Sequence, residues 1–134
     1  MTETFSVRLE GGSDGERATF EISDVENRCL LTCQYRDKAI SAEAADFFDA
    51  LISIRRQLQP GGLMPYCYGA SLNVFPSAMA RDMGQGLRAY KLVVGKHATR
   101  ADLVDIFDEG TDVVPADVDT QEQFYRDWLE SPRT

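Results

Sequence analysis

The sequence predicts an α+β protein with an antiparallel sheet of about four to six strands, a long amphipathic helix packed on one face of the sheet, and a C-terminal helix. Three observations predict this fold class. Residues 5–36 alternate apolar and polar side chains between turns, residues 41–58 place apolar side chains at helical spacing, and residues 120–130 show a second helical pattern. With 134 residues, the chain has the length of one domain, and we expect residues 1–134 to form one.

Three strands are predicted in the first part of the chain. Residues 5–9, 17–22 and 28–36 place apolar side chains at every second position, which is typical of a strand with one buried face. The glycine-rich segment 11–15 and the polar segment 23–27 lie between them and have turn composition. Because short turns favour antiparallel pairing, we expect a meander.

The clearest helix is predicted to begin at Ser41, whose hydroxyl can accept a hydrogen bond from an amide of the first turn. Residues 60–62, Pro-Gly-Gly, end it. Between these limits, apolar residues at spacings of four, three and four share one face that we expect to cover the sheet: Phe47, Leu51, Ile54 and Leu58.

The rest of the chain is less regular. Pro76 and Ser77 can open a short helix that ends at the Gly-Gln-Gly segment 84–86, and residues 87–94 have strand composition. Residues 101–108 fit a short helix capped by Thr99 or a strand equally well. The last helix is predicted to begin with a capping box formed by Thr120 and Gln123.

Charge is unevenly distributed along the chain. The formal net charge is −8, from 14 basic and 22 acidic residues. Residues 1–80 carry a net −4, residues 81–100 a net +4, and residues 101–134 a net −8. A net negative chain is unsuited to general binding of nucleic acid or of an anionic membrane. It is suited to a basic protein partner, whose field complements its own.

The acidic residues of the last third allow two interpretations. They can form a solvated face that keeps the protein soluble, or they can form a docking surface for a basic partner. The candidate partner-binding residues are Asp102, Asp105, Asp108, Glu109 and Asp112.

The segment 66–92 contains an alternative site, which a small enzyme or a domain that binds a small ligand or nucleotide would use. Its candidate ligand-binding residues are Arg81, Arg88 and Tyr90. These arginines can instead pair with the acidic last third inside the fold. Residues 84–89 also match G-x-G-x-x-A, but dinucleotide binding requires a strand before the glycines and a helix after them, and the predicted order is the reverse.

Catalytic and metal-binding motifs are not evident. A nucleophilic Cys67 would need a base such as His97 nearby, and the spacing of the two residues does not favour that pair. Cys29 and Cys33 lie in a predicted strand rather than in a zinc-binding turn, and the carboxylates lack the spacing of a calcium loop. We therefore expect no catalytic residues, no metal and no cofactor.

The N-terminus lacks the basic and apolar regions of an export signal, and no apolar run approaches the length of a membrane span. We therefore expect a cytoplasmic protein whose three cysteines are reduced thiols. The oligomeric state is not predicted.

Small size, acidity, the lack of an export signal and the lack of a catalytic signature together resemble the immunity proteins of bacterial polymorphic-toxin systems. The stretch from Tyr66 to Leu92 is also similar to segments of small proteins encoded at toxin loci. The resemblance implies a non-enzymatic inhibitor that docks on a basic toxin or effector domain, its acidic side chains standing in for the charge of the toxin's substrate. A structural adaptor that dimerises through a sheet edge is a further hypothesis.

Overall fold

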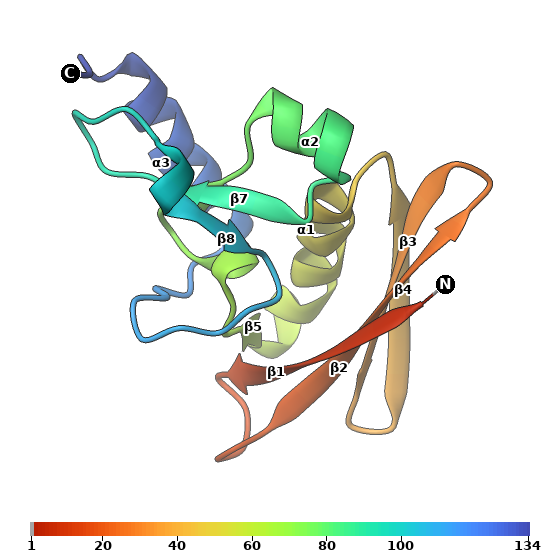
Figure 1. Ribbon diagram of the computed structural model, residues 1–134. Coiled ribbons are helices and arrows are strands. Elements are labelled where there is room, and N and C mark those ends of the chain that lie inside the picture. Colours follow the sequence, from red (N-terminus) through yellow and green to blue (C-terminus); the bar gives the residue numbers. More distant parts are fainter. Residues whose placement is uncertain (1) are drawn as a thin grey trace.

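A computed structural model describes residues 2–134 and shows an α+β fold with two antiparallel sheets and three helices (Figure 1). The larger sheet has five strands in the order β4-β3-β2-β1-β5. Its strands are β1 (Glu3–Glu10), β2 (Arg17–Val25), β3 (Arg28–Tyr35), β4 (Lys38–Ala44) and β5 (Met64–Pro65). This confirms the predicted fold class.

The smaller sheet has three strands in the order β6-β7-β8, and it lies beside the larger one. Its strands are β6 (Val74–Phe75), β7 (Arg88–Lys91) and β8 (Leu103–Asp105). The helices are α1 (Phe47–Leu58), α2 (Ala78–Gly84) and α3 (Val118–Glu130). In Figure 1, α1 lies behind β7 and against the curled large sheet, while α2 lies above β7.

The core lies between α1 and the inner face of the large sheet. The helix face predicted from the sequence is buried, as are the inward residues of β1, β2 and β3. Alternation along these strands places every second side chain in the core, as in β2, where Ala18, Phe20 and Ile22 are buried and their neighbours are exposed. This region follows directly from the period-two pattern.

The predicted start of the long helix at Ser41 is wrong. Ser41 lies in β4, where it pairs with Thr32, and α1 begins at Phe47 after the N-cap Asp46. The turn before β4 consists of Arg36 and Asp37, both at positive φ, so it lacks the glycine that usually marks such a turn. Because β4 is rich in alanine, its sequence also has the composition of a helix.

The predicted capping box of the last helix is also wrong. Asp117 is the N-cap of α3, and its carboxylate accepts a hydrogen bond of 2.8 Å from the backbone N–H of Thr120.

Residues 101–108 contain both of the predicted alternatives, a helical turn and a strand, one after the other. A 3₁₀ turn at Arg100–Asp102, closed by a capping box with Thr99, is followed at once by β8.

No helix in residues 2–134 has both the length and the apolar character needed to cross a bilayer.

Candidate functional site

A groove of about 580 Å³ opens between the beginning of β1, α2 and the β7–β8 hairpin. We call it the methionine groove. Its apolar surface comes from side chains of both sheets and of α2, and its principal lining residues are Phe5, Met79, Met83, Leu103, Phe107 and Asp108. Segments that are far apart in the sequence therefore build a single concave surface.

Two methionines on α2 form one wall of the methionine groove and have little protein contact. Met79 is 69% exposed and Met83 is 82% exposed, the two highest values among the large hydrophobic residues of the described chain. Their i, i+4 spacing places both on the same side of α2. Flexible, polarisable thioether side chains adapt to differently shaped partners, which is why methionine is common on binding surfaces.

The wall that carries the methionines is anchored to α1. Ser77 caps α2 by accepting a hydrogen bond of 3.1 Å from the backbone N–H of Ala80. Arg81 of α2 forms ion pairs of 3.0 Å with Asp46 and 2.9 Å with Asp49 at the beginning of α1. Anchoring through the opposite side of a short helix leaves the methionines outside the core.

The floor of the methionine groove is aromatic. Phe107 stacks on Phe5 of β1 with 4.9 Å between ring centroids, and it contacts Phe20 at 5.4 Å. These contacts join the loop after β8 to the larger sheet, so the groove floor is continuous with the core. A rigid floor beside flexible methionines suits the binding of an apolar side chain.

The rim of the methionine groove carries three carboxylates, Glu3, Asp105 and Asp108, and one guanidinium, Arg88. Asp105 forms an ion pair of 3.3 Å with Arg88. Asp108 has no cation partner among residues 2–134. Although Asp108 is exposed, desolvation by the surrounding groove and the neighbouring Asp105 carboxylate raise the pKa of its carboxyl above its usual value. The rim is thus net negative.

The five predicted partner-binding residues have different environments. Asp102 closes a turn by accepting a hydrogen bond of 2.8 Å from the backbone N–H of Thr99. Asp112 accepts a hydrogen bond of 2.6 Å from the Tyr68 hydroxyl and pairs with Lys91 at 3.2 Å, which together lower the pKa of its carboxyl. Asp105 and Asp108 alone line the methionine groove, so the structure brings two of the five together there.

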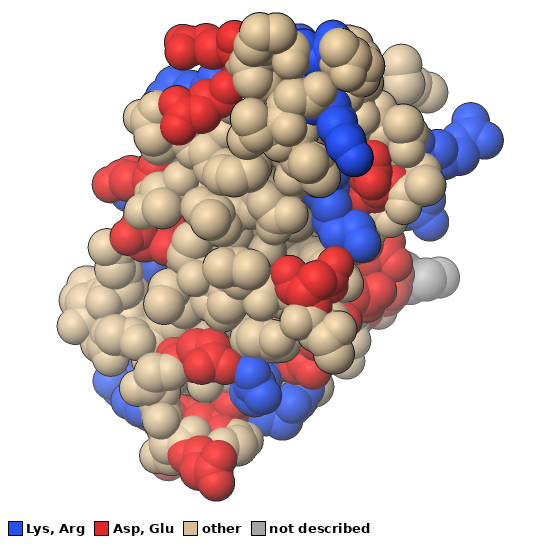
Figure 2. All heavy atoms as spheres, turned by 90° about the vertical axis from the view of Figure 1, so that its left-hand side faces the viewer, with Lys and Arg blue, Asp and Glu red and all other residues tan. Residues whose placement is uncertain are grey.

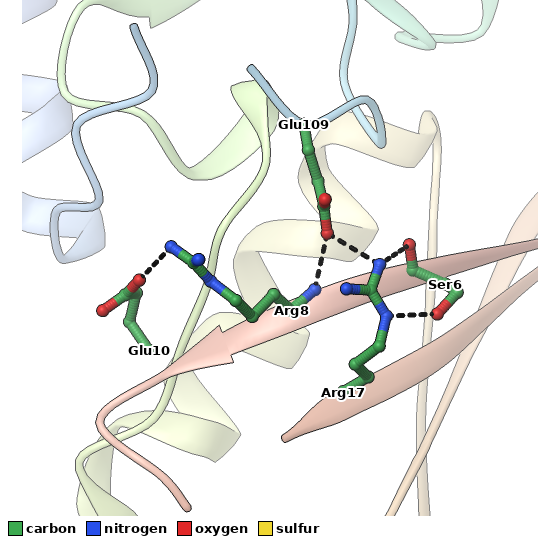
Figure 3. Close-up of polar contacts among 5 residues, drawn as sticks. All are labelled: Ser6, Arg8, Glu10, Arg17 and Glu109. Carbon is green, nitrogen blue, oxygen red and sulfur yellow. Dashed lines mark hydrogen bonds and ion pairs between the residues drawn. The ribbon is translucent and has the colours of Figure 1, made fainter. Parts of the chain in front are cut away.

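Glu109 joins the loop after β8 to strands β1 and β2 of the large sheet (Figure 3). Its carboxylate accepts hydrogen bonds of 2.8 Å from the backbone N–H of Arg8 and 2.8 Å from the Arg17 guanidinium. Arg17 also donates to the hydroxyl and the carbonyl oxygen of Ser6, at 2.7 and 3.0 Å. The Glu109 charge is thus compensated within the fold.

Acidic side chains do not form one continuous surface on the side of the molecule shown in Figure 2. Red carboxylates lie apart around a largely uncharged centre, and blue bases lie beside them. Some carboxylates of α3 are also paired within the fold, because Arg56 of α1 pairs with Asp119 at 3.0 Å and with Glu122 at 3.6 Å. Net charge along the sequence therefore overstates the field at this surface.

The alternative ligand-binding residues are divided in a similar way. Arg88 and Tyr90 line the methionine groove, whereas Arg81 is directed to Asp46 and Asp49 on α1. The glycine turn after α2 also packs against α1. A Cβ on Gly86 would lie 2.8 Å from Asp46 Oδ1, so this turn meets a carboxylate where a dinucleotide-binding turn would meet a phosphate. Its helix-then-strand order matches the predicted order.

The thiols are buried. Cys67 is fully buried, and this burial raises its pKa to about 12, so the thiolate that a nucleophile requires is disfavoured. Burial likewise raises the pKa of Cys33 to about 12. The part of the chain that the structure describes holds no cluster of three or more His, Cys, Asp or Glu side chains suited to a metal ion.

The sequence predicted the short helix that carries Met79 and Met83 but did not identify the two methionines as site residues. Apolar residues at helical spacing are normally expected to face the core. Only the orientation of α2 in the fold shows that the side carrying the two methionines is uncovered. Phe5 and Phe107 belong to the groove through a contact between distant segments, which no local pattern indicates.

Neither protein-family models nor curated proteins show a match to this chain.

Proposed function

We propose that this protein is a non-enzymatic, cytoplasmic binding protein of the immunity type, which neutralises a basic toxin or effector domain by docking it in the methionine groove. The observation that supports this most directly is the pair of exposed methionines beside an apolar floor and a net negative rim. Monomeric proteins rarely leave such a combination uncovered unless it binds something.

The chemistry of the groove defines the partner's contact residues. The floor formed with Phe5 and Phe107 suits an apolar anchor, and the carboxylate of Asp108 suits a lysine or arginine beside that anchor. Binding of that cation would offset the repulsion between Asp108 and Asp105. The proposal therefore narrows the acidic docking surface from five residues to Asp105 and Asp108, assisted by apolar contacts.

The test is binding to the protein encoded by the neighbouring gene, measured by calorimetry. Met83→Asp should weaken binding by at least tenfold, because it places a carboxylate where an apolar contact forms. Val94→Asp is the matched control, since Val94 is 57% exposed and does not line the groove. Equal affinity of both variants and the wild type would exclude the groove as the docking site.

A second candidate function, binding of a small apolar ligand, is supported by the groove's volume. Pockets for small molecules occupy roughly 300–1,000 Å³, and the methionine groove has about 580 Å³. Arg88 and Tyr90 would then supply polar contacts. Thermal-shift screening against apolar carboxylic acids and nucleotides tests this function. A rise in Tm that Met83→Asp abolishes would favour binding of a small ligand in the groove. A Tm that no compound changes would count against this function.

A further inference from the structure

We propose that a second cavity, which we call the Arg55 pocket, binds the carboxylate of a small aliphatic acid. The cavity has about 190 Å³ and lies between the end of α1, β5 and the start of α3. Its principal lining residues are Arg55, Leu63, Pro65, Ala116, Asp117 and Val118. It shares no lining residue with the methionine groove, so this inference is independent of the proposed function.

Arg55 is a buried cation that no carboxylate of residues 2–134 reaches within ion-pair distance, although Asp117 and Glu122 act on it at longer range. Its side chain belongs to a residue that is only 5% exposed. The guanidinium donates to Gln121 Oε1 at 2.6 Å, to the carbonyl oxygen of Gly69 at 3.3 Å and to that of Ala116 at 2.7 Å. All three acceptors are neutral, and within residues 2–134 no carboxylate forms an ion pair with it. A buried charge usually has such a partner because of its desolvation cost.

Arg55 nevertheless stays charged at neutral pH. Burial lowers the pKa of its guanidinium, yet only to about 10. A guanidinium has five N–H donors, and the three hydrogen bonds within the protein leave Nε–H and one Nη2–H free of an acceptor in the described chain. A carboxylate can accept from two such donors at once, which makes it a strong partner for this group.

The remaining lining residues select among anions. Leu63, Pro65 and Val118 provide apolar walls that suit a short aliphatic chain. Asp117 also lines the pocket, and the N–H of Thr120 lowers the pKa of its carboxyl, so it is ionised at neutral pH. Asp117 repels any anion in the pocket, and it repels a doubly charged one about twice as strongly, which disfavours phosphate relative to a monocarboxylate. The volume excludes a nucleotide.

Thermal unfolding at constant ionic strength tests the proposal, with acetate and isobutyrate as probes and their amides, acetamide and isobutyramide, as uncharged controls. We expect the acids to raise Tm with the logarithm of their concentration above Kd, by about 4 °C at a tenfold excess over Kd. Isobutyrate should act at lower concentration than acetate because it contacts the apolar walls. The amides and inorganic phosphate should give no such rise.

Two variants locate the effect. Ala116→Leu fills the pocket while keeping the backbone carbonyl that holds Arg55, and it should abolish the response to both acids. Arg56→Met removes the neighbouring exposed arginine, outside the pocket, and should leave the response unchanged. The proposal is overturned if the acids do not raise the Tm of the wild type, if acids and amides act equally, or if Ala116→Leu responds like the wild type.

Discussion

Between residues 3 and 44 the strands are seven to nine residues long and pair along their length, whereas between residues 63 and 117 they are two to four residues long. The first region, together with α1, is held mainly by buried apolar side chains. In the second region, backbone carbonyl oxygens accept hydrogen bonds from polar side chains of the flanking helices. Gln121 of α3 donates to Gly69, Ser71 and Val74, and Arg55 of α1 donates to Ala116. The comparison indicates that polar side chains from outside the segment hold its irregular backbone in place.

The largest effect is expected from removing the polar centre of the second region. Gln121 is fully buried, and its amide donates to the carbonyl oxygens of Gly69, Ser71 and Val74 while its oxygen accepts from Arg55. Gln121→Leu leaves these groups unsatisfied and should lower the free energy of unfolding by about 4 kcal/mol. Urea unfolding measures this loss.

Gln123→Leu on the same helix is the control for that substitution, because Gln123 bonds only to exposed side chains of α3. It should change the free energy of unfolding by less than about 0.5 kcal/mol. A similar small change for Gln121→Leu would show that polar contacts do not hold the second region.

The first region should depend on apolar packing instead. Leu31 is fully buried under α1, and Leu31→Ala should cost about 3 kcal/mol by leaving a cavity. Leu30→Ala, at the next position of β3 and on its opposite face, should cost clearly less. Urea unfolding of both variants checks this difference, and equal losses would contradict the assignment of the two faces.

A smaller effect is expected at the wall of the methionine groove. Ser77→Ala removes the N-cap of α2 and should cost about 1 kcal/mol. Because α2 holds Met79 and Met83, the same change should weaken partner binding. Ser71→Ala, at a hydroxyl remote from α2, would serve as the binding control. If Ser77→Ala leaves the affinity for the partner unchanged, binding in the methionine groove does not depend on the N-cap of α2.

Partner binding should also depend on pH through Asp108. The pKa of Asp108 is raised in the free protein, and a partner cation would lower it, so the bound state holds fewer protons. Affinity should therefore rise as the pH increases through the raised pKa of Asp108 and become constant above it. Calorimetry across mildly acidic pH checks this trend, and Asp108→Asn should flatten it.

Much of the first region could be predicted from the sequence, because a period of two and the spacing of Phe47, Leu51, Ile54 and Leu58 report directly on burial. The exception was β4, whose two-residue turn has no glycine and whose alanines resemble a helix. In the second region, the short helix α2 and its Ser77 cap were predicted, since capping is a local interaction.

The site was less predictable than the fold. Ion pairs between distant segments, such as Glu109 with Arg17 and Asp112 with Lys91, determine which acidic residues are compensated. These pairs depend on tertiary arrangement, so a count of charges along the sequence could not separate Asp108 from its neighbours. The groove formed by Phe5, Phe107 and the two exposed methionines could not be predicted for the same reason, because it also depends on tertiary arrangement.

Methionine methyl NMR tests the proposed docking surface most directly. The described chain has three methionines, of which Met79 and Met83 line the methionine groove and Met64 lies in β5 away from it. Addition of the basic partner to methyl-labelled protein should shift or broaden the Met79 and Met83 signals and leave Met64 unchanged. Binding that perturbs Met64 alone, or that leaves both groove methionines unperturbed, would contradict docking in the groove.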